Sequence, residues 1–274
     1  MSDITNARRA VQQRQVSRRI GLRSRNAQGA GQRATRLGIF GRGRLGSEIA
    51  RAAGGRDGIE LAWAQGRGGL PGAEVDAVVD ASSGEAVHEH ARWAIEHGAD
   101  LVIAATGWEP AALEGLDLSG IGILVAPNLS LAAAFMRRAA LALGRFAALD
   151  ASSELSIVER HHRMKADSPS GTAKLLAAAL AEGCPRYAGW AQGSAEPGRL
   201  SVASLRAGTC VGYHELRLES GTERLVLSHE ALDRGVFAQG ALRAVEWIRG
   251  RKGLYSFDDL AAEIMDRVFE EGTI

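Results

Sequence analysis

The 274-residue chain has 33 Lys and Arg against 32 Asp and Glu, a formal net charge of +1, and 46% hydrophobic residues. This composition is typical of a globular protein and excludes a disordered or fibrous chain. No apolar run approaches the roughly 20 residues of a membrane span, and the N-terminus lacks the apolar core of a secretory signal. Only two cysteines are present, Cys184 and Cys210, without metal-like or disulfide-framework spacing, so we expect a cytoplasmic protein with no membrane partner.

The first 36 residues form a basic arm with nine arginines and one acid, which leaves 24 basic and 31 acidic residues in the remainder. Such an arm could contact nucleic acid or a membrane surface. Its polar composition, without steady apolar periodicity, is more typical of a poorly ordered extension. We therefore leave residues 1–34 out of the predicted fold and do not expect nucleic acid as a partner.

From Arg36 onward, short apolar strands alternate with helices. A strand over residues 36–40 leads through a glycine turn into a helix whose Leu45, Ile49 and Ala53 share one face. Helical crossovers between later strands imply a parallel sheet covered on both faces, that is, a doubly wound α/β domain. The later elements are predicted strands at 60–64, 77–80, 101–104 and 122–126, a helix at about 85–97 and a short helix around Ala111.

The region after Asn128 has a different character. A long helix to about Leu149 is followed by consecutive strands, which suggest an antiparallel sheet; they are predicted at 155–160, 200–206, 212–219 and 223–229. We expect the helix after Gly235 to return to the first domain, because Ala241, Val245 and Ile248 recur at helical spacing. The predicted division is a first domain of residues 35–128 and 232–274, with an α+β domain of residues 129–231 inserted into it.

A glycine loop follows the first predicted strand. Gly41, Gly43 and Gly46 have the G-x-G-x-x-G spacing between a strand and a helix. The first glycine permits a tight turn, the second lets the backbone approach a pyrophosphate, and the third allows close packing of helix against strand. The free N–H groups at the helix start would bind phosphate, and Arg42 and Arg44 could add positive charge there. This context predicts a dinucleotide site.

The end of the second strand lacks the acid that usually binds the adenosine ribose. Gln65 could bond a ribose hydroxyl instead, and Arg67 could receive a 2′-phosphate, which favours NADPH mildly over NADH. The alternative, that Arg67 is a solvated loop residue, is equally consistent with the sequence.

Residues 159–173 concentrate titratable groups between a strand and a helix. His161, His162 and Lys165 supply a possible acid and cations. Hydroxyls and backbone N–H groups of Ser170, Gly171 and Thr172 stand at the predicted helix start, where a carboxylate would bind. In isolation the segment could equally be an ordinary helix cap with a core histidine and a solvated lysine. No metal is expected, because the adjacent histidines point to opposite sides of an extended chain and no further Cys or His lies nearby in sequence.

The segment resembles the active-site segment of the dihydrodipicolinate reductase family, since E-x-H-H-x-x-K-x-D-x-P-S-G-T-A matches it position by position. The resemblance covers the chain from about Arg36 to the C-terminus. The other matching stretches are the glycine loop, Asp80 before Ser82 and Ser83, Thr106-Gly107-Trp108, residues 126–130, residues 204–208 with Gly212 and His214, and residues 234–237 with Gly240 and Ala241.

The resemblance implies a reductase that converts 4-hydroxy-tetrahydrodipicolinate to tetrahydrodipicolinate with NADPH or NADH, in diaminopimelate and lysine biosynthesis. It implies a Rossmann-like nucleotide domain and an inserted α+β domain for substrate binding and for assembly as a homotetramer. His161 is then the proton donor and Lys165 a cationic catalytic and substrate-binding group. His162, Gly171 and Thr172 would hold the substrate carboxylates, and the Ser170 hydroxyl stands with them. The implied cofactor contacts are Gly41, Arg42, Gly43, Arg44 and Leu45, then Ala104, Ala105 and Thr106, then Ala126, Pro127, Asn128 and Leu129.

Three departures from the family pattern stand out. Ala104-Ala105-Thr106-Gly107 replaces the common Gly-Thr-Thr-Gly, which removes a hydroxyl near the nicotinamide. The acid after the second strand is replaced. The segment between Ala64 and Val75 leaves no room for a further strand and helix.

Two other functions share part of this pattern. A different two-domain amino-acid or imine dehydrogenase would have the same glycine loop, but the paired histidines and the Pro-Ser-Gly-Thr run argue against it. A non-catalytic nucleotide-sensing protein would use the basic arm for nucleic acid and show salt-dependent binding without turnover.

Overall fold

The structure is a computed structural model that describes residues 33–270, with side chains to residue 266. All but the last two residues of the predicted basic extension lie outside this range. The first sheet has six parallel strands in the order β11-β5-β4-β3-β1-β2. They are β1 (Thr35–Phe40), β2 (Ile59–Gln65), β3 (Ala77–Asp80), β4 (Asp100–Ile103), β5 (Gly122–Val125) and β11 (Gly253–Ser256).

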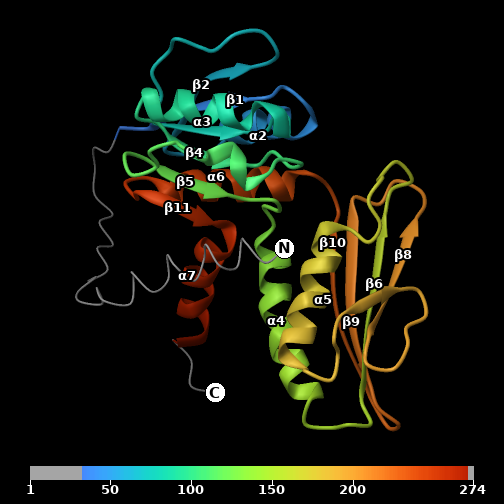
Figure 1. The fold of residues 1–274 in the computed structure, drawn as a ribbon. Helices are drawn as coiled ribbons and strands as arrows, with labels where there is room; N and C mark the ends of the chain where they lie inside the picture. Colours follow the sequence, from blue (N-terminus) through green and yellow to red (C-terminus); the bar gives the residue numbers. More distant parts are fainter. Residues whose placement is uncertain (1–32, 271–274) are drawn as a thin grey trace.

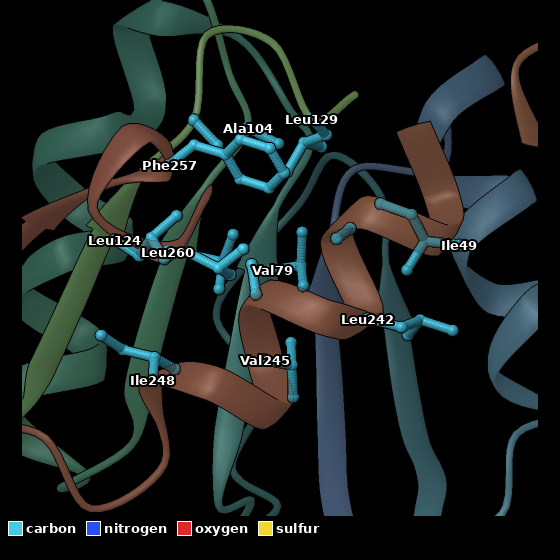
Figure 2. Packing of buried hydrophobic residues seen from close by; sticks show 14 of the residues in the cluster. Ile49, Val79, Ala104, Leu124, Leu129, Leu242, Val245, Ile248, Phe257 and Leu260 are labelled. Carbon is cyan, nitrogen blue, oxygen red and sulfur yellow. The ribbon is translucent and has the colours of Figure 1, made fainter. Parts of the chain in front are cut away.

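Helices cover both faces of this sheet, because alternate strand residues point to opposite sides. Leu37 and Ile39 pack against α2 (Arg44–Ala53), α6 (Gly235–Ile248) and α7 (Phe257–Glu270). Figure 2 shows Leu242, Val245 and Ile248 on α6, next to Ile49, Val79 and Leu124. Phe40 points to the other face, which is covered by α3 (Val87–Glu96) and by the short helices η1 (Gly84–Ala86) and η2 (Pro110–Leu113).

The strand order reverses between β1 and β3. From β1 the chain goes outward to β2, then returns to β3 on the other side of β1. In open parallel sheets, ligands bind beyond the carboxyl ends of the strands at such a switch point. The structure therefore directs a ligand to the loops after β1, β3, β4 and β5.

The second sheet has five strands in the order β10-β9-β6-β8-β7. These are β6 (Glu154–His161), β7 (Trp190–Gln192), β8 (Leu200–Arg206), β9 (Gly212–Glu219) and β10 (Arg224–Ala231). Helices α4 (Leu131–Ala147) and α5 (Gly171–Gly183) lie side by side against one face and share its core (Figure 1).

The predicted antiparallel pattern was wrong for part of this sheet. β9 runs antiparallel to β6 and β10, but β8 runs parallel to β6 and β7. The reason is α5, which carries the chain from the end of β6 back to the start of β7, so the next strands run in the direction of β6. The second unit therefore contains a β-α-β crossover of its own.

The two units share long helical connections. The chain enters the second unit through α4 and returns through α6, which packs on the first sheet as predicted. α7 lies beside α4 (Figure 1), where Arg138 Nη2 is 2.8 Å from Asp266 Oδ1. Among the described helices, none is both long and apolar enough to cross a membrane.

Candidate active site

The glycine loop connects β1 to α2 in a conformation that tolerates no side chains at two positions. Gly41 has φ +97°, and a Cβ there would lie 2.5 Å from the Ala81 carbonyl oxygen. A Cβ on Gly46 would lie 1.9 Å from the Gly41 carbonyl oxygen. Gly43, in contrast, faces open space, and no atom lies within 4 Å of the position that a Cβ would take there. The loop thus leaves its middle glycine exposed at the start of α2, where free N–H groups favour an anion.

The other predicted cofactor residues lie at the neighbouring strand ends. Gln65 ends β2, and its backbone carbonyl accepts a hydrogen bond from Gly41 N at 2.8 Å, while Arg67 is exposed in the following loop. Ala104 N and Ala105 N both donate to the Asp80 carbonyl at 2.9 Å, and the two methyl groups are buried. Thr106 is exposed beyond them.

The residues after β5 continue the same edge of the sheet. Ala126 is buried and donates from its N–H to the Ile103 carbonyl at 2.9 Å, Pro127 is exposed and Leu129 is buried. The structure therefore places the three predicted groups of cofactor contacts at one edge of the first sheet, although they come from distant parts of the sequence.

A cleft of about 630 Å³ opens between the two units. Arg42, Gly43 and Arg44 line one side of it, and the residues between β10 and α6 line the other, with Val211 from the second unit. Arg234 belongs to this lining and stands at the start of α6. Three arginines and two acids, Glu48 and Asp233, thus line one open space, whose formal charge of +1 suits a negatively charged ligand.

The segment after β6 brings the predicted chemical groups to the same region. His161 is the last residue of β6 and is 7% exposed, whereas His162 is half-buried, with its N–H bonded to the Cys210 carbonyl at 2.7 Å. Burial lowers the pKa of His162, and the positive charges of Arg234 and Arg44 lower it further. Both arginines line the cleft, and Cys210, whose carbonyl holds the N–H of His162, directly precedes Val211 in the same lining.

Lys165 is engaged by a neighbouring carboxylate. Lys165 Nζ lies 2.6 Å from Asp167 Oδ1. Burial raises the pKa of Asp167, but the hydrogen bond and charge of Lys165 and the N–H of Gly171 outweigh this effect, so the pKa is lowered. The Asp167 carboxylate therefore contacts two groups that the sequence predicted for the substrate.

The start of α5 is capped and open to a ligand. Ser170 Oγ accepts a hydrogen bond from Ala173 N at 3.1 Å, while Gly171 is exposed and Thr172 is half-buried. Asn128 Nδ2 donates to Thr172 Oγ1 at 3.1 Å. A predicted cofactor residue and a predicted substrate residue are thus in direct contact, which joins the two halves of the site.

Three further residues complete this region and were not assigned a role from the sequence. Glu159 is fully buried; its Oε1 is 2.7 Å from Arg206 Nη2, and its Oε2 is 2.8 Å from His161 Nδ1. His214 Nε2 is 3.1 Å from Ser170 Oγ, and the His214 ring stands edge-on to the His161 ring at 5.1 Å. Burial and the neighbouring His161 lower the pKa of His214 to about 4. Glu159 is the first residue of the matched segment, whereas Arg206 and His214 reach it through the register of β8 and β9 with β6, for which that segment carries no signal.

These contacts bear on the expectation that no metal binds here. That expectation relied on the absence of a third ligand nearby in sequence, but the fold places Glu159, His161 and His214 so that one ligand atom from each lies within 4.8 Å of the others. Spacing in the sequence therefore does not decide the question, and the absence of a metal stays a prediction. The Glu159 carboxylate is already paired with Arg206, however, and this cation opposes a metal ion at the same place.

Comparison with known proteins gives one consistent family. Family models described as "Dihydrodipicolinate reductase, N-terminus" and "Dihydrodipicolinate reductase, C-terminus" match residues 71–129 and 129–261. A 4-hydroxy-tetrahydrodipicolinate reductase of Myxococcus xanthus is 38% identical over 201 residues, which is 70% of this chain and 73% of the relative. The reductase of the same description from Acidiphilium cryptum is 36% identical over 244 residues, 82% of this chain and 96% of the relative.

A solved structure has the same fold. The dipicolinate-bound dihydrodipicolinate reductase from Paenisporosarcina sp. TG-14 superposes with a TM-score of 0.66 at 21% identity and covers 82% of this chain and 99% of the other.

Proposed function

We propose that His161 and Lys165 are the catalytic residues of this chain, which belongs to the dihydrodipicolinate reductase family. This family consists of NAD(P)H-dependent oxidoreductases that reduce 4-hydroxy-tetrahydrodipicolinate in lysine and diaminopimelate biosynthesis. His161 protonates the carbon next to the reduced ring carbon, and Lys165 holds the dicarboxylate. The observation that supports this most is the hydrogen bond from Asn128 Nδ2 to Thr172 Oγ1 at 3.1 Å, which joins the proposed cofactor edge of the first sheet to the start of α5.

The surroundings of His161 suit a proton donor. Its Nδ1 contacts Glu159, so its Nε2 is the nitrogen available for the substrate. The chain has Gly212 opposite that nitrogen, where even a Cβ would come within 3.1 Å of Nε2. A glycine here keeps a side chain from crowding Nε2. A well-placed general acid is typically worth about 10²- to 10⁴-fold in rate.

The start of α5 would hold a substrate carboxylate. The Ser170 hydroxyl, the N–H groups of Gly171 and Thr172 and the Thr172 hydroxyl gather at this end of the helix, with Lys165 and His162 nearby. An anion at a helix N-terminus gains from the unpaired N–H groups and from the helix dipole. The substrate carboxylates would replace Asp167 at Lys165.

The glycine loop fits a dinucleotide, because Gly43 lies open where a pyrophosphate would approach and Gly41 and Gly46 admit no side chain. We propose Gly41 to Gly46, Gln65 and Arg67, Ala104 to Thr106, and Ala126 to Leu129 as its contacts. When bound, the reduced nicotinamide supplies the hydride. Arg67 in the loop after β2 would meet a 2′-phosphate, and Asn128 would keep Thr172 in place.

We also propose a cytoplasmic homotetramer, assembled through the face of the second sheet that α4 and α5 leave open. On this face Glu215 bonds to Tyr213 and Arg217, and it is only 8% exposed although none of the described helices covers it. Leu205 is 54% exposed on the same face and Val226 47%. Light scattering of the purified protein tests the assembly, and a monomer at micromolar concentration would contradict it.

The first experiment is oxidation of NADPH, and separately of NADH, by the purified protein with the freshly made product of the preceding synthase. His161→Ala should lower turnover by about 10²-fold or more while cofactor binding is retained. Lys165→Ala should raise KM for the substrate as well. Loss of cofactor binding in His161→Ala, or wild-type turnover, would contradict the proposed role.

A further inference from the structure

The other partners of Glu159 determine which residue donates the proton in the contact between Glu159 and His161. Its Oε1 accepts from Arg206 Nη2 at 2.7 Å and from Ser170 N at 3.3 Å. Its Oε2 lies 2.8 Å from His161 Nδ1; both atoms are buried, and neither has a hydrogen bond to any other described group, so they can satisfy only one another. The carboxylate thus bridges three parts of the site: β6, β8 and the cap of α5.

The carboxylate is held in its ionised form. Burial alone would raise the pKa of Glu159, but hydrogen bonds from His161, Ser204, Arg206 and Ser170 outweigh it and hold the pKa well below its usual range. An ionised carboxylate only accepts hydrogen bonds. The His161 nitrogen that faces it must therefore carry a proton.

This requirement fixes the tautomer of the imidazole. With Nδ1 protonated, neutral His161 has its lone pair on Nε2, the nitrogen beside Gly212. That nitrogen can then take up and release the proton used in the reaction, and the carboxylate stabilises the imidazolium that exists between these steps. We infer that Glu159, kept ionised by Arg206 and Ser170, is a positioning residue that holds the His161 proton on Nδ1 and presents Nε2 as the acid.

The contacts of Glu159 are better explained by this positioning role than by a contribution to the stability of the fold. A buried ion pair is weak evidence for stability, because desolvation of both charges offsets most of their attraction. Arg206 also donates to the Asp167 carbonyl at 2.6 Å, so the same guanidinium orients the loop that carries Lys165. The inference rests on the proposed function, because it needs His161 as the acid.

The test is the pH dependence of kcat/KM in Glu159→Gln. The amide removes the charge beside the imidazolium and places an NH₂ group opposite Nδ1. A nearby opposite charge shifts a pKa by about 1 to 3 units, so the falling alkaline limb should move at least about one unit toward acid. Glu159→Asp keeps the charge and should retain the wild-type position of that limb with a lower kcat. Dipicolinate and NADPH affinities, measured separately, should stay near wild type in both variants.

Glu154→Gln is the matched control, because Glu154 is exposed at the start of the same strand. It should leave the pH profile unchanged. A Glu159→Gln profile identical to wild type, with His161→Ala inactive, would overturn the inference and leave the proposed function standing. Full activity in His161→Ala would remove both.

A spectroscopic measurement on the wild-type protein does not depend on the Glu159 variants being stable. In the wild-type protein labelled with ¹⁵N-histidine, the His161 resonances are assigned by their loss in His161→Ala. Above the titration of the ring, Nδ1 should resonate as a protonated nitrogen and Nε2 as an unprotonated one. The reverse assignment would overturn the inference.

Discussion

The hydrogen bond between Asn128 and Thr172 predicts the direction in which the Thr172 hydroxyl donates its proton. Asn128 Oδ1 accepts from Ser130 N at 2.9 Å, which fixes the amide orientation, so its Nδ2 donates to Thr172 Oγ1 at 3.1 Å. A hydroxyl that accepts this bond still has its own proton to donate. The Thr172 O–H is therefore directed toward the place proposed for a substrate carboxylate.

Asn128→Asp reverses this arrangement. The second carboxylate oxygen can only accept, so the Thr172 hydroxyl turns its proton toward residue 128 and loses its bond to the ligand. A hydrogen bond to a charged group is worth about 1.5 to 3 kcal/mol, which corresponds to about 10- to 150-fold in affinity. Calorimetric titration with dipicolinate should show a loss in this range. Thr172→Val removes the same bond and should show a similar loss.

A double-mutant cycle separates this effect from the added negative charge. In the Thr172→Val background there is no hydroxyl to turn, so Asn128→Asp should weaken dipicolinate binding much less than in wild type. Equal losses in both backgrounds would refute the reasoning, because the effect of Asn128 would then not pass through the Thr172 hydroxyl.

Further predictions follow from other contacts. Gly46→Ala should weaken NADPH binding at least about tenfold, because its Cβ would lie 1.9 Å from the Gly41 oxygen; Gly55→Ala, with open space at its Cβ, is the control in a fluorescence titration. Asp167→Asn should tighten dipicolinate binding, because it frees Lys165 from its internal carboxylate; weaker binding would show that Asp167 orients the lysine instead. Arg67→Ala should lower kcat/KM for NADPH by up to about fivefold, the scale of an exposed ion pair, and leave NADH unchanged; an equal loss with both cofactors would contradict the 2′-phosphate contact. The pKa of His214 is about 4 when folded and about 6.5 when unfolded. The unfolded chain then binds more protons between these values, so the free energy of unfolding should fall, by up to about 3 kcal/mol, as pH drops from about 6.5 to about 4. Urea unfolding across this window should show a flatter dependence in His214→Asn, and an unchanged slope would assign the effect to other groups.

Much of the first sheet could be predicted from the sequence. β3 has the predicted bounds, as do β8 and β9 of the second sheet, and the apolar strands between glycine turns predicted the doubly wound class of the first sheet. β11 and α7 were missed because Gly253-Leu254-Tyr255-Ser256 is a four-residue strand without alternation, placed directly before a helix. Such a strand is defined by its partner β5 and not by its own pattern.

The site was predictable only where its residues are adjacent in sequence. The candidate catalytic and substrate-binding residues from His161 to Thr172 lie in one segment, so their residue types and spacing could be recognised directly in the sequence. Arg206 and His214 join it only because β8 and β9 flank β6 in one register, with Arg206 opposite His161 and His214 opposite Glu159. Register depends on the packing of the whole sheet, which no local pattern contains.

The return of α6 to the first sheet has a consequence for the order in which the protein is made. The apolar face that includes Leu37, Ile39 and Val79 is synthesised early, but α6 covers it only after Gly235 has left the ribosome, when the whole second sheet is already available. Domains usually fold from the N-terminus during synthesis. Here synthesis of the first unit begins before that of the second unit but is completed after it. The apolar face of the first sheet therefore stays without α6 while the whole second unit is translated.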